Sequence, residues 1–405
     1  MKLPLNRDFD WTLLLLWFIL ITMGFIAIYS ASTIKIDDEI IRSNYYLKQI
    51  IWISLSFVSL YIILKLPMPI IDLMVIPVYI LTNLMLIAVL FMPAINQSHR
   101  WISLMGFRFQ PSELAKLIVI LLTAKILAKE SILNVKSVIK PLIYMILPMS
   151  LIIIEPDLST TIVFWVAYFI MLAQAGFKGL YLILIITPII SIVTSFYVPI
   201  FVIFALLLIY FLWKSKLSIH FISLVMIINI FFVFLTPVLW NKLKPYQQNR
   251  ILTFIDPSKD PLNTGYQIIQ AKIAIGSGQL TGKGFLEGTQ KNLNFLPENH
   301  TDFIFSVISE EFGFAGSALL LTIFLLFFLK ILNSIKKTEI KERQIAIAGF
   351  FGFLFFQTLT NLGMNIGLMP VTGISLPFIS YGGSNLLINT IAVALILKFS
   401  QEKDL

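Results

Sequence analysis

The stretch "LLLLWFILITMGFIAIYS", residues 13–30, runs for eighteen residues without a charged side chain. A helix needs about 20 predominantly apolar residues to cross the hydrocarbon core of a bilayer. Apolar side chains stand on every face of this stretch, whereas a membrane strand would alternate apolar with polar residues. The stretch therefore predicts a membrane-spanning helix. It is too long for the apolar core of a signal peptide, so we expect it to remain as the first helix.

Similar runs recur along almost the whole chain of 405 residues. Hydrophobic residues make up 58% and charged residues only 13%, whereas about 25% of the residues in a soluble domain are charged. We predict an all-α polytopic integral membrane protein that forms one membrane domain over residues 1–405. The predicted spans are 11–30, 46–64, 70–92, 112–128, 138–154, 158–175, 180–196, 199–213, 218–239, 304–331, 344–367 and 383–398.

The positive charges indicate the orientation of these spans. With the N-terminus in the cytoplasm, the inner segments carry seventeen lysines and arginines and the short outer loops carry six. Basic residues are enriched in cytoplasmic loops, so both termini are expected inside and the long loop, residues 240–303, outside. The net charge of +9 is thus explained by topology, and we expect no nucleic-acid partner. The chain has no cysteine and three scattered histidines, which predicts no disulfide framework and no zinc site.

The polar sequence gathers in four segments, residues 96–116, 155–160, 246–303 and 367–385. In the predicted topology all four lie on the outer side. We therefore expect a shared cavity of charged side chains there, and function on the outer face.

Asp302 stands directly before the apolar run "FIFSVIS", 303–309. An aspartate in that position can cap a helix N-terminus, or it can act as a general base at the membrane boundary. His300, two residues earlier, is grouped with it as a substrate-binding candidate. Glu310 and Glu311 lie further into the span, where a charged side chain normally faces a cavity or a partner; Glu310 is either a ligand of the substrate or the partner of a lysine.

Segment 96–116 contains Arg100, Trp101, Glu113 and Lys116. Glu113 and Lys116 are three residues apart and share a helix face, which favours an ion pair. Alternatively, Arg100 and Lys116 bind a diphosphate. Asp157, in "EPDLST", is either a substrate ligand or the N-cap of the next span.

The long loop combines an amphipathic half with a glycine-rich half. "YQIIQAKIAI", 266–275, favours a surface helix whose Lys272 reaches a lipid headgroup. "GSGQLTGKGFLEG", 276–288, has five glycines whose backbone donors could cradle phosphate, although it lacks the Walker A spacing. Plain turn structure is the alternative.

Four long motifs closely resemble the SEDS family of bacterial shape, elongation, division and sporulation proteins, and the resemblance covers nearly the whole chain. The motifs are "SHRWISLMGFRFQPSELAK" (98–116), "NRILTFIDPSKDPLNTGYQIIQAKIAIGSGQLTGKGFLEGTQ" (249–290), "FLPENHTDFIFSVISEEFGF" (295–314) and "PVTGISLPFISYGGSN" (370–385). The loop motifs are more like those of the elongation member than of the division member. The family usually has ten spans, so the twelve predicted here imply an extra helical hairpin between 180 and 239. Asn385 is a second, smaller departure, because small residues are usual there.

The resemblance implies a peptidoglycan glycosyltransferase that polymerises lipid II into β-1,4 glycan strands on the outer face of the bacterial cytoplasmic membrane. It implies a class B penicillin-binding protein and other elongation-complex membrane proteins as partners. Asp302 corresponds to the essential carboxylate of the family and would be the general base, with Arg100, Lys116 and Lys272 on the leaving diphosphate. A divalent cation near that diphosphate is an open alternative, with Glu113 and Glu310 available as ligands. A lipid II flippase and a non-catalytic scaffold for a cell-wall synthase remain as alternative functions.

Overall fold

The computed structural model describes residues 9–36, 39–93, 99–104, 107–130, 135–215, 217–256, 264–293 and 295–402. The chain forms two compact units, residues 1–175 with 253–405 (unit 1) and residues 176–252 (unit 2). The single membrane domain over 1–405 stays a prediction, and the units are described separately.

Unit 1 contains most of the helices and four short strands. Its helices are α1 (Trp11–Ala31), α2 (Tyr45–Lys65), α3 (Met68–Leu90), α4 (Pro111–Ala128), α5 (Val135–Ile154), α6 (Leu158–Ala175), α11 (Thr264–Ser277), α12 (Thr289–Asn292), α13 (Ile304–Lys337), α14 (Lys341–Asn365) and α15 (Gly383–Phe399). Helix α10 (Pro245–Ile255) crosses the sequence boundary between the units.

Each of the twelve predicted spans corresponds to one helix within a few residues. Eight of these helices are long and apolar enough to cross a membrane. Among the other four, α7, α8 and α15 are apolar but have 17 residues each. Helix α4 carries Glu113, Lys116 and Lys125 within its 18 residues. The prediction of an all-α polytopic membrane protein is confirmed.

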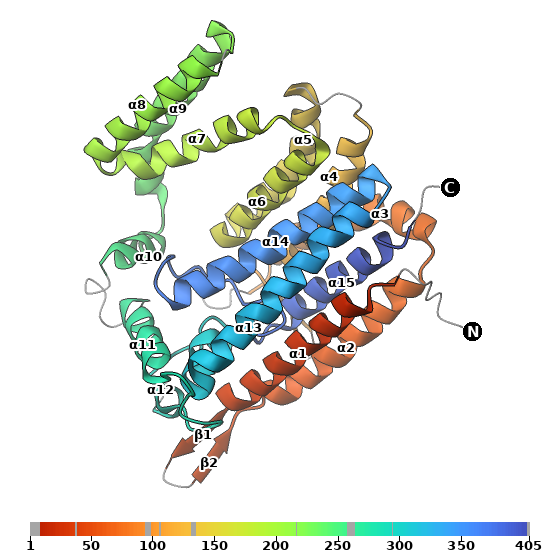
Figure 1. Ribbon diagram of the computed structural model, residues 1–405, viewed down its shortest axis with the longest axis vertical. Coiled ribbons are helices and arrows are strands. Elements are labelled where there is room, and N and C mark those ends of the chain that lie inside the picture. Colours follow the sequence, from red (N-terminus) through yellow and green to blue (C-terminus); the bar gives the residue numbers. More distant parts are fainter. Residues whose placement is uncertain are drawn as a thin grey trace. The chain divides into compact units, whose positions relative to one another are not determined.

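Helix α14 is the central helix of unit 1 and packs against α4, α6 and α13. Helix α15 packs mainly against α2, and α1 packs against α13 (Figure 1). Buried residues of α14 include Phe350 and Phe353 at 0% exposure. Polar side chains on a helix that is buried on nearly all faces need partners inside the protein. Some of the polar residues of α14 lie next to the site described below.

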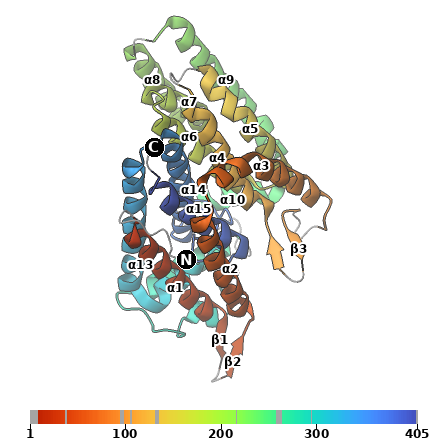
Figure 2. The same ribbon diagram turned by 90° about the vertical axis from the view of Figure 1, so that its right-hand side faces the viewer.

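The four strands form two antiparallel hairpins. Strands β1 (Thr33–Ile36) and β2 (Glu39–Arg42) continue beyond the ends of α1 and α2 (Figure 2). Strands β3 (Ile102–Leu104) and β4 (Phe107–Phe109) lead into α4. Hydropathy did not predict these hairpins because each strand has only three or four residues.

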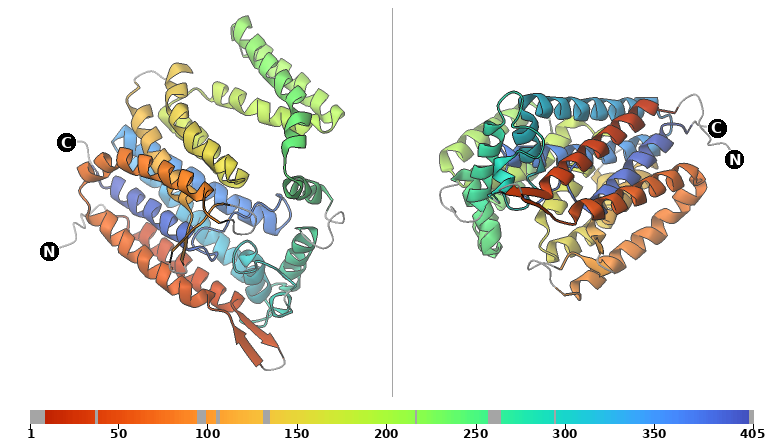
Figure 3. Two further views of the ribbon diagram at one scale, coloured as in Figure 1. Left: turned by 180° about the vertical axis from the view of Figure 1, so that it is seen from behind. Right: turned by 90° about the horizontal axis from the view of Figure 1, so that it is seen from below.

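The two ends of unit 1 are chemically different. Both views in Figure 3 place the start of α1 and the end of α15 at the same end. At that end, buried Arg343 binds Asp72 at 2.7 Å and Glu402 at 2.9 Å. At the opposite end, residues of the polar segments in unit 1 contact one another, in agreement with their predicted common side: Gln110 with Ser384, Ser159 with Thr372, and His300 with Tyr381.

Unit 2 consists of α7 (Gly179–Ser195), α8 (Val198–Lys214) and α9 (Ile219–Lys242). Helices α7 and α9 are joined by buried polar contacts, since Asn229 Oδ1 accepts from Ser191 Oγ at 2.7 Å and Asn229 Nδ2 donates to Thr187 Oγ1 at 3.0 Å. Residues 180–213 lie in two separate helices, α7 and α8.

Candidate active site

The non-helical segment 366–382, together with the first residues of α15, connects the polar parts of unit 1. Thr372 O accepts from Ser159 Oγ at 2.7 Å, which joins the segment to α6. Ser384 Oγ is 3.1 Å from Gln110 N, which joins it to the start of α4. Segment 366–385 thus contacts groups that lie 213 and 274 residues earlier in the chain.

Asp302 lies next to Gly373 of this segment. A Cβ added to Gly373, whose φ is +77°, would lie 3.7 Å from Asp302 Oδ2. The amides of Thr301, Asp302 and Phe303 all donate to the carbonyl of Glu298, which forms the tight turn before α13. Asp302 is half-buried.

In the capping alternative, Asp302 is the N-cap of the helix that follows it. The observed N-cap position is one residue later. The N-cap residue of α13 is Phe303 and makes no side-chain cap bond. The amide of Ser306, which donates to Phe303 O at 3.0 Å, also donates to Asn365 Oδ1 at 3.2 Å.

His300 is held by aromatic rings beside Asp302. Its ring stacks on Tyr45 with centroids 4.1 Å apart and lies 5.7 Å from the ring of Tyr381. Its carbonyl accepts from Tyr381 N at 2.9 Å. Burial lowers the pKa of His300 below its ordinary value, with the Glu298 carboxylate opposing this effect. The imidazole is therefore neutral at pH 7 and can exchange hydrogen bonds with a hydroxyl group.

Arg100 is anchored on the turn between α5 and α6. Its Nε donates to Glu155 O at 3.1 Å, its Nη2 donates to Pro156 O, and its Nη1 lies 3.8 Å from Asp157 Oδ1. Asp157 also accepts from Thr160 N at 3.2 Å, so it caps α6 as the simpler alternative stated. Arg100 thus uses two of its five N–H donors on main-chain carbonyls and pairs with Asp157. Trp101 is half-buried directly before β3.

The carboxylate of Glu155, in the same turn, is buried. The residue is 0% exposed, and neither side-chain oxygen has a hydrogen-bond partner among the residues that the structure describes. Burial raises the pKa of Glu155 to about 8; the Asp157 carboxylate adds to this shift and Arg100 opposes it. Glu155 is therefore mainly protonated at neutral pH. Sequence reasoning missed it, although "EPD" places two acids at the end of an apolar span.

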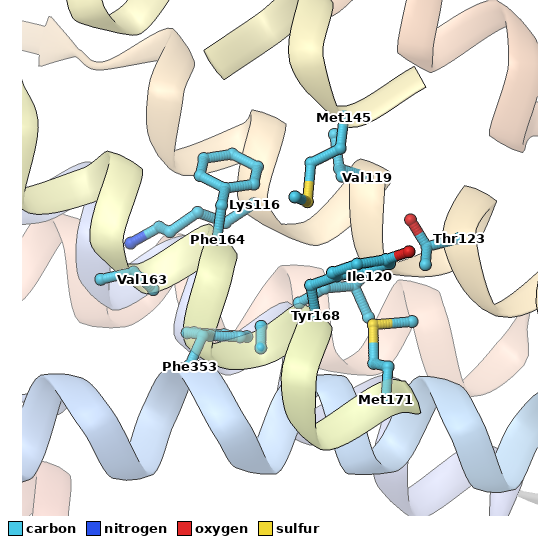
Figure 4. Close-up of a pocket in the computed structure, with 11 residues that line it drawn as sticks. Lys116, Val119, Ile120, Thr123, Met145, Val163, Phe164, Tyr168, Met171 and Phe353 are labelled. Atoms are coloured by element: carbon cyan, nitrogen blue, oxygen red, sulfur yellow. The ribbon is translucent and has the colours of Figure 1, made fainter. Parts of the chain in front are cut away.

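Glu113 and Lys116 form the predicted ion pair, with Lys116 Nζ 2.8 Å from Glu113 Oε2. Asn385 Nδ2 donates to the same oxygen at 3.2 Å, which gives this departure from the family pattern a structural role. Lys116 is 2% exposed and borders a cavity of about 10 Å³ between α4, α5, α6 and α14 (Figure 4). That volume holds about one water molecule. In this conformation Lys116 cannot contact a diphosphate.

Lys272 is the exposed cation of the candidate set. It lies on α11, whose Ile268, Ala271 and Ala274 are buried, while Ile269 and Ile273 are 40% and 45% exposed. Its Nζ would lie 2.5 Å from a Cβ added at Gly367, so it crosses the start of segment 366–385. Lys272 forms no ion pair with any residue that the structure describes.

Glu310 binds the long loop. Its carboxylate accepts from Lys283 Nζ at 2.7 Å, from Thr289 N at 2.9 Å and from Gln290 N at 3.1 Å. It therefore caps α12 and pairs with a lysine, as the simpler alternative stated, which leaves it little capacity to bind a substrate.

The glycine-rich loop packs directly on a break in α13 at Gly313, whose φ is 64°. Lys283 N and Gly284 N donate to the carbonyls of Glu310 and Glu311, each at 3.0 Å. A Cβ on Gly282 would come within 2.1 Å of Glu311 O. The loop amides thus complete the interrupted helix hydrogen bonds, and the glycines permit this close approach. The phosphate-cradle alternative is not supported by these contacts.

Among the described residues, no three histidine, cysteine, aspartate or glutamate side chains are grouped so that they could hold a metal ion. Glu113 and Glu310 are each bound to a lysine instead.

The chain was compared with family models and with known proteins. The family model FTSW_RODA_SPOVE, described as "Cell cycle protein", matches residues 10–202 and 199–405. The two matches meet inside α8, in the region where we predicted the extra hairpin. Peptidoglycan glycosyltransferase MrdB of Escherichia coli K12 is 34% identical over 313 residues, which covers 76% of this chain and 73% of the relative. Peptidoglycan glycosyltransferase RodA of Treponema pallidum is 31% identical, with 97% of this chain and 98% of the relative covered.

Division-type relatives are also similar. The probable peptidoglycan glycosyltransferase FtsW of Haemophilus ducreyi is 32% identical and covers 99% of this chain and 92% of its own length. A chain in a structure titled "Structural coordination of polymerization and crosslinking by a peptidoglycan synthase complex" superposes with a TM-score of 0.72 at 26% identity, covering 97% of this chain and 98% of that chain. The rod shape determining protein RodA of Thermus thermophilus has the same fold, with a TM-score of 0.65, 23% identity and 98% of each chain covered. The chain therefore belongs to the FtsW/RodA/SpoVE family, the SEDS proteins.

Proposed function

We propose that this chain, a peptidoglycan glycosyltransferase by its family and its named relatives, polymerises lipid II into β-1,4 glycan strands with Asp302 as the general base. The observation that carries the proposal is the position of Asp302. Its main chain is held in a tight turn, the residue is half-buried, and its carboxylate lies near Gly373 in the segment that joins the polar clusters. General bases act through such positioned carboxylates.

In the proposed reaction, the Asp302 carboxylate takes the proton from the 4-hydroxyl of the acceptor GlcNAc. The resulting oxygen nucleophile attacks the anomeric carbon of the donor, and the bond to the undecaprenyl diphosphate breaks with its electron pair on the diphosphate. A single displacement inverts the anomeric centre, so an α-linked donor gives a β-linked glycan. The neutral His300 supplies a hydrogen bond to a sugar hydroxyl.

The three candidate cations, Arg100, Lys116 and Lys272, are not equally free to contact the leaving diphosphate. Lys116 is buried and paired, and Arg100 donates to two carbonyls. Lys272 is exposed and has no ion-pair partner among the described residues, so we assign it the main charge on the diphosphate. Gly367 beside Lys272 and Gly373 beside Asp302 are six residues apart, which limits their separation to about 20 Å. Arg100 then acts mainly by fixing the α5–α6 turn.

We further propose that the end of unit 1 that carries Asp302 faces the outside of the cytoplasmic membrane, as the positive-inside pattern predicts, with both termini in the cytoplasm. The partner is a class B penicillin-binding protein. Support for this partner is the likeness to a chain of a peptidoglycan synthase complex. The role is in cell elongation, which rests on the loop motifs, since both elongation and division relatives match.

The test is glycan formation from purified lipid II by the purified protein, with and without its class B penicillin-binding protein. Asp302→Asn keeps the size of the side chain and removes the base. We expect product from the parent pair and none from the variant pair. A folded Asp302→Asn protein that polymerises at the parent rate would refute the assignment of the base. No product from any sample would favour the flippase or the scaffold.

A further inference from the structure

Two asparagines of α14 lie behind Asp302, inside the protein. Asn361 and Asn365 are both 0% exposed and are four residues apart, so they share one face of the helix. Polar side chains within a membrane span are costly unless they face partners in the protein. Their partners therefore indicate what this face of α14 does.

Both asparagines donate to the same atom, the main-chain carbonyl oxygen of Asp302. The distances are 3.0 Å from Asn361 Nδ2 and 2.9 Å from Asn365 Nδ2. A carbonyl oxygen has two lone pairs, so both are occupied by this pair of amides. The main chain at Asp302 is thus fixed from the side of α14.

The two side-chain amides also bind the two elements next to Asp302. Asn361 Nδ2 also donates to Ile374 O at 2.8 Å, in segment 366–385. Asn365 Oδ1 accepts from Ser306 N at 3.2 Å and from Ser306 Oγ at 2.6 Å, at the start of α13. Each amide orientation is set by its partners, because a flipped amide would place oxygen against a carbonyl. Two side chains thereby join α14, the start of α13 and segment 366–385.

We propose that Asn361 and Asn365 are positioning residues for glycosyl transfer. They hold the main chain of Asp302 in register with Ile374 and its neighbour Gly373, against which the Asp302 carboxylate lies. This inference rests on the proposed function, in which Asp302 is the base. A displacement of about 1 Å at a reacting group can lower a rate about 100-fold, so loss of either amide shifts the carboxylate away from the acceptor hydroxyl.

The experiment measures kcat and KM for lipid II with the purified protein and its penicillin-binding partner. The variants are Asn361→Ala, Asn365→Ala and Asp302→Asn. Ser306→Ala is the matched control, because it removes one buried hydrogen bond to Asn365 and leaves both bonds to Asp302 in place. Thermal unfolding of each variant in detergent is measured in parallel.

We expect kcat to fall about 10- to 100-fold in Asn361→Ala and Asn365→Ala, with KM unchanged within about twofold, since the asparagines do not touch the substrate. Ser306→Ala should keep kcat within about twofold of the parent, although it should lose about as much thermal stability as the two asparagine variants. A positioning role is wrong if the folded asparagine variants keep the parent kcat, if the change appears mainly in KM, or if Ser306→Ala loses as much activity.

Asn365→Ala leaves the bond from Asn361 to Asp302 in place, so it decides the question if Asn361→Ala does not fold. The proposed function is tested separately by Asp302→Asn. An inactive Asp302→Asn beside asparagine variants of parent activity would refute only the positioning role, whereas an active Asp302→Asn would refute the base itself.

Discussion

Replacing Lys291 by methionine should release the glycine-rich loop from the helices beneath it. Lys291 is 0% exposed, and its Nζ lies 2.5 Å from Glu311 Oε1 and 3.0 Å from Ser30 O. Methionine fills a similar volume but cannot neutralise Glu311, which is 1% exposed. Removing one partner of a buried ion pair costs about 3 to 5 kcal/mol because a buried charge remains unpaired.

A neighbouring pair provides the control. Lys35 binds Glu287 of the same loop at 3.2 Å, but the two side chains are 41% and 54% exposed. Exposed pairs contribute about 0.2 to 1 kcal/mol, so Lys35→Met should have little effect. The double variant Lys291→Met/Glu311→Met removes both charges together and should recover much of the lost stability.

The assay is limited chymotrypsin cleavage at Phe285, which lies in the loop and is 42% exposed. When opening is fast relative to cleavage, the cleavage rate follows the population of the open loop. A loss of 3 to 5 kcal/mol corresponds to an increase in that population of about 100- to 1,000-fold or more, limited by full opening. If Lys291→Met is cleaved no more than about tenfold faster than Lys35→Met, the buried pair does not hold the loop as we reason.

Three further results are expected. Gly373→Ala forces a side chain onto a backbone with φ +77° and toward Asp302, at a conformational cost of about 1 to 2 kcal/mol, so kcat should fall. The control Gly383→Ala would collide with Trp52 and should mainly lower the yield of folded protein. Lys272→Ala should weaken turnover of lipid II at least tenfold and Lys272→Arg should restore most of it, measured as kcat/KM; equal activity of all three proteins would exclude Lys272 from the diphosphate site. Glu155→Gln should raise thermal stability with a defined pH dependence. The pKa of Glu155 is raised from 4.5 to about 8, so the folded protein retains a proton that the unfolded chain releases, and the parent loses stability as pH rises from about 4.5 to 8. The gain from Glu155→Gln should be absent at pH 4 and largest above pH 8, and a gain independent of pH would contradict a protonated Glu155.

Sequence patterns predicted the helices and their common polar end because both depend on local composition. A run such as residues 13–30 must be helical in lipid whatever its neighbours are, since only internal hydrogen bonds satisfy its backbone there. Counting the predicted membrane spans between the four polar segments put all four on one side of the membrane. Contacts such as that of Ser159 with Thr372 agree with this placement. The resemblance in motifs supplied the family and matched Asp302, already a candidate from its position, to the essential carboxylate of that family.

The availability of each charged side chain could not be deduced in the same way. Arg100 and Lys116 were the first candidates for binding diphosphate, with Lys272 added to them, yet packing buried Lys116 against Glu113 and placed Arg100 on the carbonyls of the α5–α6 turn. Asn361 and Asn365 were not noticed as site residues, although two amides four residues apart in an apolar span are a detectable signal.

The sequence by itself therefore determined a helical membrane protein, the order of its spans, and the end at which its polar chemistry gathers, because hydropathy and charge act locally along the chain. Only the tertiary structure decided which charges are neutralised, why the glycines of the long loop are required, and what fixes the main chain at Asp302. The physical reason is that these outcomes depend on contacts between residues far apart in sequence. Ser30 and Glu311 are separated by 281 positions, and no local pattern encodes their meeting.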